Sequence, residues 1–453
     1  MARVFRLRRA TAENDTSALR PAGVVVPEVA GPSRSSSAWT LVGRCNQSSG
    51  QAAAHDAEGI AMRGTSALVT AGALVLLAGC QGGDGGGTAA AATTTAPPEP
   101  VAVEVSPADG ATDVSPTVPL EISVTDGELT GVSVVDDAGA EVTGSVADSA
   151  EDPAVDVWTP DTPLAYGAGY TLTATAQGAD AGTAEAATTF TTVTPQTQLT
   201  PSIGPLDGQT VGVGMPIRVY FEEPVTEKAA VERDLVVTSS TPTDGVWNWF
   251  SDTEVHFRPS EYWPENTDVT LEADLYGVHL GNGVWGETDR TVSFRVGERH
   301  VSIADASTHQ MEVYDGDQLV QTFPISAGSP DNPSYNGPHV VTEMNRHRVM
   351  DSSTYGVPVD SPDGYRTPVE YAVRLSDSGE FVHAAPWSVA QQGRENVSHG
   401  CINVSTENAR WFFQFSQPGD VVEIRNSDAG TLRSPIDDWT IPWEEWRAGS
   451  ALT

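Results

Sequence analysis

Short alternating hydrophobic and polar positions dominate residues 101–298. Runs such as Tyr170–Ala174 and Val269–Ala273 place an apolar side chain at every second position. A period of two is typical of β-strands with one buried face. Glycine, proline and aspartate interrupt the runs at short intervals, so we expect short strands joined by tight turns.

The same pattern occurs twice in this region. Pro107-Ala108-Asp109-Gly110 recurs as Pro205-Leu206-Asp207-Gly208, and the strand runs that follow keep the same spacing. Units of about 100 residues built from short strands are typical of immunoglobulin-like sandwiches. We therefore predict two such domains, at 101–195 and 196–298, which act as spacers.

The second unit carries additional aromatic residues. Either they form a sugar-binding surface or they pack in the core and between domains, and we favour packing because aromatics dominate cores and interfaces. These residues are Trp247, Trp249, Phe250, Tyr262 and Trp263.

The pattern changes to a longer β-rich domain at 299–425. Strands such as Val301–Ala304 and Gln310–Tyr314 are expected to meet at the hairpin turn Asp315-Gly316. Within this domain, Ser405–Gln417 is the one stretch with helical spacing. Its apolar side comprises Ala409, Phe412, Phe413 and Phe415. The fold class is therefore all-β, with one short helix in this last domain.

A tryptophan-rich extension follows at 426–453. Trp439, Trp443 and Trp446 recur at spacings of four and three, which on a helical turn places them on one side. We expect this stripe to pack back onto the 299–425 domain or onto the second spacer.

The segment 62–80 has the features of an export signal. A charged start precedes the apolar run Ser66–Leu77, which is too short to span a membrane, and Leu77-Ala78-Gly79-Cys80 resembles a bacterial lipobox. We expect Cys80 to be lipidated, which anchors the chain on the extracellular face of the cell membrane.

The segments on either side of this signal have no pattern of a folded domain. Residues 81–100 are rich in Gly, Ala, Thr and Pro and are expected to form a flexible linker that reaches into the cell wall. Residues 1–61 show no sustained apolar period, so we interpret them as an over-long start, with Met62 as the true initiator.

The chain of 453 residues is strongly acidic. Lys+Arg of 24 against Asp+Glu of 61 gives a net charge of -37. This charge argues against nucleic acid or an anionic membrane surface as a partner held by electrostatics.

Cys401 is the cysteine available for chemistry in an exported chain. Cys45 precedes the export signal and Cys80 ends it, so Cys401 has no disulfide partner and is either an inert buried side chain or a nucleophile. His383 lies eighteen residues earlier, and a Cys and a His brought together by folding can perform acyl transfer. Gly400 lets the backbone approach a substrate, so N–H groups near Gly400 and Cys401 could bind an oxyanion.

A zinc site is the other reading of these side chains. His383, His399 and Cys401 are all plausible ligands, but a fourth ligand and the usual paired spacing are lacking, so we predict no metal and no cofactor. His339 and His347 have no motif around them and are interpreted as ordinary loop residues.

The stretches Phe381–Trp387 and Ser398–Val404 resemble the signature of the L,D-transpeptidases with a YkuD-type catalytic domain. The likeness is closest to the mycobacterial and actinobacterial lipoproteins with two Ig-like domains, and it extends from Met350–Gly356 to Asp438–Trp446. It implies an enzyme that forms 3→3 peptidoglycan cross-links. Cys401 would attack a tetrapeptide stem, D-alanine would leave, and a second stem would accept the acyl group.

The resemblance also implies roles for individual residues. His383 would take the thiol proton and be held in one tautomer by the carbonyl of Ala384. His399 is either an auxiliary base or a residue whose backbone alone matters, and its place beside Gly400 favours the backbone role. Carbapenem β-lactams would be covalent inhibitors. The substrate-site positions that carry over are Tyr365, Ser378, Gly379 and Asn403, with Trp387, Ser398 and Met350 around them.

Three alternatives stay open at this point. Tyr365 and Trp387 could be plain packing residues. An L,D-carboxypeptidase or cysteine peptidase would use the same Cys–His pair with water as acceptor. A non-catalytic wall-binding lipoprotein would not need Cys401.

Overall fold

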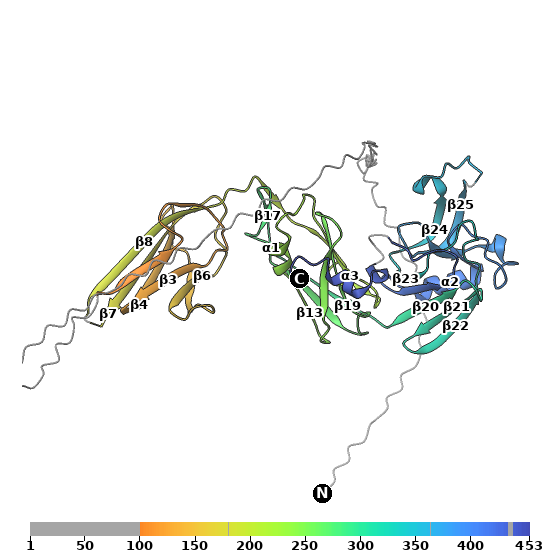
Figure 1. The fold of residues 1–453 in the computed structure, drawn as a ribbon, viewed down its shortest axis with the longest axis horizontal. Coiled ribbons are helices and arrows are strands. Elements are labelled where there is room, and N and C mark those ends of the chain that lie inside the picture. Colours follow the sequence, from red (N-terminus) through yellow and green to blue (C-terminus); the bar gives the residue numbers. More distant parts are fainter. Residues whose placement is uncertain (1–99, 180, 363, 434–437) are drawn as a thin grey trace, which may run out of the picture. The chain divides into compact units, whose positions relative to one another are not determined.

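The computed structural model describes residues 100–453 except 180, 363 and 434–437. The predicted extension 1–61, the signal 62–80 with Cys80, and the linker up to residue 99 lie outside the described residues. Strands dominate the described chain, with three α-helices among them, so the all-β prediction is confirmed (Figure 1). Within this part of the chain no helix is long and apolar enough to cross a membrane.

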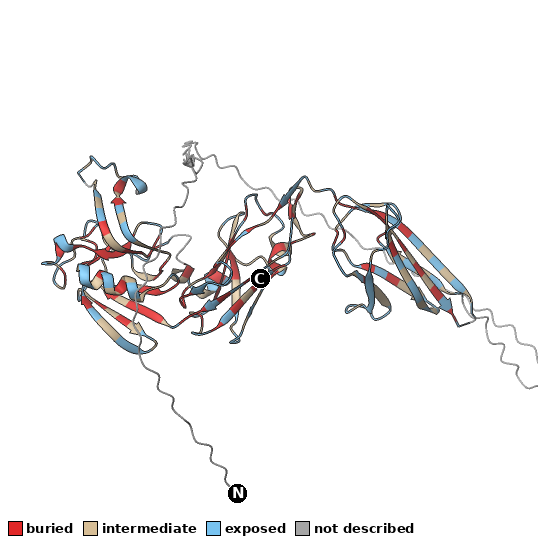
Figure 2. Cartoon of the chain, turned by 180° about the vertical axis from the view of Figure 1, so that it is seen from behind, coloured by how far each residue is buried: buried red, intermediate tan, exposed pale blue. Residues whose placement is uncertain are grey.

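The first Ig-like unit is a sandwich of two four-stranded sheets around its own core. One sheet has the order β1 (Ala102–Ser106), β3 (Leu120–Thr125), β6 (Val155–Pro160) and β5 (Gly144–Asp148). The other has the order β2 (Ala111–Val114), β8 (Thr183–Thr192), β7 (Gly169–Gly178) and β4 (Gly127–Asp136). Buried and exposed positions alternate along these strands, as the period of two requires (Figure 2).

The second Ig-like unit repeats this arrangement. Its first sheet has the order β10 (Ser202–Gly204), β12 (Ile217–Tyr220), β15 (Glu254–Pro259) and β14 (Gly245–Trp249). Its second has β11 (Thr210–Val211), β19 (Arg290–Val296), β16 (Asp268–Ala273) and β13 (Leu235–Ser239). A smaller sheet of β17 (His279–Gly281), β18 (Val284–Gly286) and β9 (Thr197–Leu199), and the helix α1 (Lys228–Arg233), complete it.

The repeated Pro-x-Asp-Gly motif has the same structural role in both units. Asp109 accepts the N–H of Thr189 at 2.9 Å, and Asp207 accepts the N–H of Ser293 at 2.9 Å. The glycine after each aspartate donates to the carbonyl of the same partner residue, at 2.7 Å in both cases. The motif thus ties the start of each unit to its last long strand.

Four of the five aromatic residues predicted to pack do so in or against the core of the second unit, and Phe250 packs edge-on against Trp446 of the tail. Trp247 and Trp263 are buried, and Trp249 and Tyr262 pack against the same core. This core continues into the next domain through Val301. The sugar-surface alternative for these side chains is therefore not supported.

Two sheets form the domain after residue 299. The first has the order β22 (Gln318–Pro324), β21 (Gln310–Asp315), β20 (His300–Asp305), β28 (Val421–Arg425) and β23 (Gly337–Val340). The second has the order β24 (Glu343–Asp351), β25 (Arg366–Arg374), β26 (Phe381–Ala384) and β27 (Ile402–Val404). The Asp315-Gly316 turn joins β21 to β22, so the expectation that it joins the two earlier strands was wrong.

The predicted helix is present as α2 (Thr406–Phe415). Ser405 caps it by accepting the N–H of Asn408 at 3.2 Å, and Ala409 and Phe412 are buried on its inner face. Because α2 begins directly after β27, it fixes the end of the strand that follows Cys401.

The tryptophan-rich tail packs on the second Ig-like unit, as predicted. The indole of Trp439 donates to the carbonyl of Gly214 at 2.7 Å, and that of Trp446 donates to the carbonyl of Val246 at 2.8 Å. The expectation of one helical stripe was wrong, since a 3₁₀ turn (Asp438–Thr440) and the short helix α3 (Trp443–Arg447) divide the segment. All three indoles nevertheless surround the guanidinium of Arg258, at 4.4–5.2 Å from the ring centroids.

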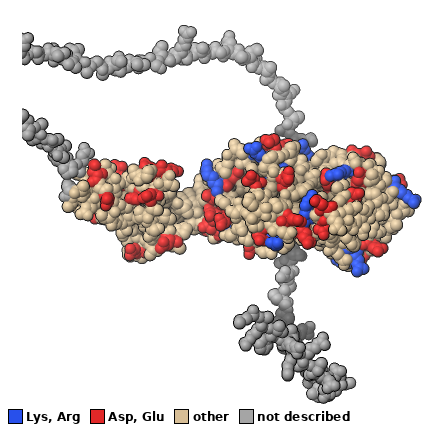
Figure 3. Space-filling view, turned by 90° about the horizontal axis from the view of Figure 1, so that it is seen from below, with Lys and Arg blue, Asp and Glu red and all other residues tan. Residues whose placement is uncertain are grey.

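Acidic side chains are scattered over the visible face of the molecule, with basic ones interspersed only beyond the first unit (Figure 3). Residues 101–200 contain no lysine or arginine. This distribution agrees with a role of the charge in solubility.

Candidate active site

Two parallel strands bring the Cys and His motifs together. Strand β26 pairs with β27 so that His383 lies opposite Asn403, and Cys401 immediately precedes β27. Side chains two residues apart on a strand point to the same side. His383, Asn403 and Cys401 therefore share one face of the sheet, although the two motifs lie apart in the sequence.

This face opens into a cavity of about 320 Å³. The cavity lining includes the predicted catalytic pair and most of the predicted substrate residues. The lining residues are Met350, Tyr365, Thr367, Val369, His383, Trp387, Val397, Ser398, His399, Cys401 and Asn403.

The imidazole of His383 is held as a neutral base. It is buried, and its Nδ1 lies 3.0 Å from the carbonyl oxygen of Ala384, which makes Nδ1 the protonated nitrogen and leaves the Nε2 lone pair free to accept a proton. This is the hydrogen bond expected from the sequence. Burial lowers the pKa of His383 below its ordinary value, and the Ala384 hydrogen bond only partly opposes this, so the ring is uncharged at neutral pH.

The thiol of Cys401 is also neutral at rest. The residue is 8% exposed, and burial raises the pKa of its thiol to about 12. The S–H group donates to the carbonyl of Gly379, with Sγ and O 3.6 Å apart. A thiol of this kind reacts only when a base removes its proton as it attacks, because the thiolate is the nucleophile.

Gly400 requires the conformation that only glycine adopts readily, with φ of +114°. Its N–H donates to Ser398 Oγ at 3.1 Å, and the Ser398 hydroxyl donates to the carbonyl of Cys401 at 2.6 Å. The Gly400 carbonyl accepts a hydrogen bond from Ser334 at 2.7 Å. The expected oxyanion donor at Gly400 is therefore occupied by the Ser398 hydroxyl in the resting site.

Most predicted substrate residues lie around the thiol. Ser378 and Gly379 line a second cavity of about 220 Å³, which shares Met350 and Tyr365 with the first. The thiol reaches toward this second cavity through its hydrogen bond to Gly379. Asn403 is buried, and its amide donates to Ser388 at 3.2 Å.

The rings of Trp387 and Tyr365 line the main cavity beside the imidazoles of His383 and His399. Trp387 is 57% exposed, and its ring centroid lies 6.1 Å from that of His383. The ring of Tyr365 lies 5.2 Å from that of His399, which is exposed. Because Tyr365 and Trp387 line the cavity, they are placed to contact a ligand in addition to packing.

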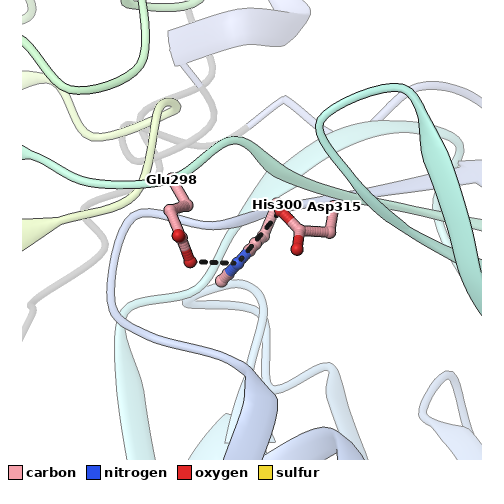
Figure 4. A group of neighbouring side chains, drawn as sticks. All are labelled: Glu298, His300 and Asp315. Carbon is pink, nitrogen blue, oxygen red and sulfur yellow. Dashed lines mark ion pairs between the residues drawn. The ribbon is translucent and has the colours of Figure 1, made fainter.

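The side chains that most resemble a set of metal ligands lie in a different cluster. Among the described residues, the group of side chains near enough to share an ion is Glu298, His300 and Asp315, which does not include Cys401 (Figure 4). Burial alone would lower the pKa of His300, but its hydrogen bond to Asp420 and the neighbouring carboxylates raise it. The carboxylates around His300 thus favour its protonated form, which fits an ion-pair network.

Sequence reasoning missed Glu380 and misread His339. Glu380 is buried directly before β26, and His339 is fully buried in β23 with its Nε2 3.2 Å from Glu380 Oε2. His339 is thus not a loop residue, and that interpretation was wrong. His347 is also in a strand, β24, but it is exposed. The sequence offered one signal for Glu380: it is an acidic residue among the apolar residues at the start of a strand, in Gly379-Glu380-Phe381-Val382.

Comparisons with known protein families agree with this geometry. The model of the L,D-transpeptidase catalytic domain (YkuD) matches residues 299–424. The bacterial Ig domain model (Big_10) matches residues 111–279, across parts of both predicted spacers.

Individual relatives extend the similarity over most of the chain. L,D-transpeptidase 2 of Mycobacterium tuberculosis (strain CDC 1551 / Oshkosh) is 40% identical over 348 residues, which cover 76% of this chain and 84% of that protein. L,D-transpeptidase 5 of Mycobacterium tuberculosis (strain ATCC 25618 / H37Rv) is 36% identical over 365 residues, covering 79% and 78%. A solved structure of LD transpeptidase LdtMt1 in complex with imipenem is 37% identical and covers 51% of this chain and 100% of that chain, with a TM-score of 0.45.

Proposed function

The chain belongs to the L,D-transpeptidases with a YkuD-type catalytic domain, and from this premise we propose that Cys401 is its nucleophile, acting on peptidoglycan stem peptides. The observation that carries the proposal is that Cys401 and a neutral His383 line one cavity on one face of the sheet. This arrangement supplies a nucleophile and a base without a metal or cofactor.

The first half of the reaction forms an acyl-enzyme. The S–H group turns from the Gly379 carbonyl toward His383, and Nε2 takes its proton as Sγ bonds to the carbonyl carbon at the L-centre of the third stem residue. The resulting oxyanion collapses, the C–N bond to D-alanine breaks, and the imidazolium returns its proton to the leaving amine. A thioester on Cys401 remains.

The oxyanion needs donors that the resting site holds elsewhere. In this proposal the Gly400 N–H turns from Ser398 Oγ to the developing charge. Ser398 Oγ stays in place and keeps its hydrogen bond to the Cys401 carbonyl. The cost is one hydrogen bond, which the oxyanion replaces with a stronger charge-assisted one.

The second half transfers the acyl group. The side-chain amine of the third residue of another stem attacks the thioester and gives its proton to His383. The C–S bond breaks, and the thiol is re-formed with that proton. The product is a 3→3 cross-link, whereas water in place of the amine would make the protein an L,D-carboxypeptidase.

Product analysis tests this function. The protein is incubated with a disaccharide tetrapeptide, and mass spectrometry measures cross-linked dimer, tripeptide and free D-alanine. We expect dimer and D-alanine from the wild type and neither from Cys401→Ala. Tripeptide alone would assign the hydrolase, and turnover by Cys401→Ala would overturn the role of the cysteine.

The proposed site of action is the outer face of the cell membrane. The supporting observation is the sequence Leu77-Ala78-Gly79-Cys80, which has the form of a lipobox. Cys80→Ala should release the protein into the medium or leave its signal uncleaved, while the wild type partitions into detergent. A wild type without N-terminal lipid mass would contradict the anchor.

A further inference from the structure

Glu380 is a buried carboxylate behind the nucleophile that the proposed reaction does not use. It is 4% exposed and lies directly before the strand that carries His383. It also packs under the nucleophile motif, because a Cβ on Gly400 would lie 3.9 Å from its Cγ. Burying a carboxylate is costly unless its oxygens are well paired, so its contacts indicate what it holds in place.

Both carboxylate oxygens of Glu380 are engaged. Oε1 accepts the backbone N–H of Tyr335 at 2.8 Å. Oε2 accepts the hydroxyls of Ser376 at 3.0 Å and Ser378 at 3.4 Å. One side chain therefore joins the segment at 335 to the turn at 376–379.

The partner of Oε2 on the opposite side is His339. Its Nε2 lies 3.2 Å from Glu380 Oε2, and its Nδ1 lies 2.8 Å from the carbonyl oxygen of Gly337. Because Nδ1 must carry a proton to bond a carbonyl, the ring is oriented with Nε2 toward the carboxylate. His339 therefore fixes the Glu380 side chain from the side opposite the two serines.

Each segment that Glu380 holds makes a direct contact with the nucleophile motif. The turn at 376–379 presents the Gly379 carbonyl that accepts the Cys401 thiol. The segment at 335 begins with Ser334, whose hydroxyl donates to the Gly400 carbonyl at 2.7 Å. Loss of the Glu380 contacts would release both supports of the Gly400–Cys401 peptide at once.

We propose that Glu380 and His339 are positioning residues that hold Cys401 and Gly400 in the geometry needed for acyl transfer. The proposal rests on the proposed role of Cys401 as nucleophile. The carboxylate acts through its hydrogen bonds to the two supporting segments, and His339 holds it from the opposite side.

The test compares two reactions of the same thiol in intact protein. Acylation by a carbapenem needs both an aligned thiol and the oxyanion donors, whereas alkylation by iodoacetamide needs only an accessible thiol. Because both rates are measured on folded protein at one temperature, their ratio does not follow global stability. We expect Glu380→Ala to lower the ratio by about 100-fold, the typical effect of a misplacement near 1 Å.

Two further variants separate positioning from charge and from stability. Glu380→Gln should keep a ratio close to the wild type, since the amide oxygen can accept from Tyr335 while the two N–H groups of the amide donate to His339 and to the Ser376 hydroxyl oxygen. Asp420→Ala is the matched control, because Asp420 is also a buried carboxylate that accepts a backbone N–H, from Gln417, and faces a histidine, His300. It should lower the melting temperature without changing the ratio.

Each outcome decides the proposal. An unchanged ratio in Glu380→Ala, or an equal fall in Asp420→Ala, would reduce Glu380 to a stabilising residue. A loss in Glu380→Gln as large as in Glu380→Ala would show that charge, not position, is required. If Glu380→Ala does not fold, Ser376→Ala should lower the ratio in the same direction but less. A wild type that is alkylated at Cys401 but not acylated would instead overturn the proposed function, and the positioning role with it.

Discussion

Trp446→Ala should destabilise the protein strongly while leaving the chemistry of Cys401 intact. The indole is fully buried, donates to the Val246 carbonyl at 2.8 Å, packs edge-on against Phe250 and lies 4.4 Å from the guanidinium of Arg258. None of these contacts reaches the active-site cavity. The substitution therefore tests whether the tail is a structural clamp on the second Ig-like unit.

The magnitude follows from these contacts. Truncating a buried Trp to Ala costs about 3–5 kcal/mol. The Val246 carbonyl also loses its partner, at a further cost of about 1 kcal/mol or more. We expect a total near 5 kcal/mol, which for a folded region of this size corresponds to about 10–20 °C in melting temperature.

The assay is thermal unfolding followed by circular dichroism, with the rate of Cys401 acylation at 25 °C as the second readout. Trp443→Ala is the matched control, because this indole is only half-buried and its contact is the Arg258 guanidinium at 5.2 Å, worth about 1 kcal/mol. Equal melting temperatures for the two variants would refute the clamp. A slow acylation rate in a Trp446→Ala protein that is still folded would show that the tail also supports the site.

Two further predictions concern pH. Burial lowers the pKa of His383 below its ordinary value of 6.5, so the acylation rate should be constant between pH 7 and 6.5 and should decline only at pH values below 6.5. A decline centred above pH 6.5 would contradict a neutral resting base. Both ring nitrogens of His256 contact carboxylates, at 2.7 Å from Asp438 and 3.0 Å from Glu254. Burial alone would lower the pKa of His256, but these two contacts raise it above its ordinary value. The stabilisation that the protonated ring provides is therefore complete below pH 6.5 and is lost as pH rises through the folded-state pKa. The difference in unfolding free energy between wild type and His256→Gln should therefore be largest below pH 6.5 and narrow above it, and a difference that grows with pH would contradict the assignment.

Local patterns predicted much of the fold. Alternation identified the strands of the two Ig-like units, and helical spacing identified α2 with its buried Ala409 and Phe412. The break in the tail between the turn at Asp438 and the helix at Trp443 could not be predicted from the sequence. It depends on the positions of the carbonyl groups of the second Ig-like unit that accept hydrogen bonds from the indoles.

Part of the candidate site could also be predicted from local sequence patterns. Cys401 and His383 carry chemistry in their own motifs, and the carbonyl that orients His383 comes from the next residue. The Glu380–His339 pair joins residues 41 positions apart, His339 on β23 and Glu380 directly before β26, so the two are seen to be partners only when the chain is folded. The occupation of the Gly400 N–H by Ser398 likewise depends on a side-chain rotamer that no sequence pattern encodes.

The central claim is that Cys401 is the acyl-accepting nucleophile and His383 its base. The most direct measurement is intact-protein mass spectrometry after incubation with a carbapenem, followed by digestion to locate the adduct. The account predicts one adduct per chain on the peptide containing Cys401, none in Cys401→Ala, strongly slowed formation in His383→Ala and no effect of a chelator. An adduct that persists in Cys401→Ala, that chelation prevents, or that forms equally fast in His383→Ala would contradict it.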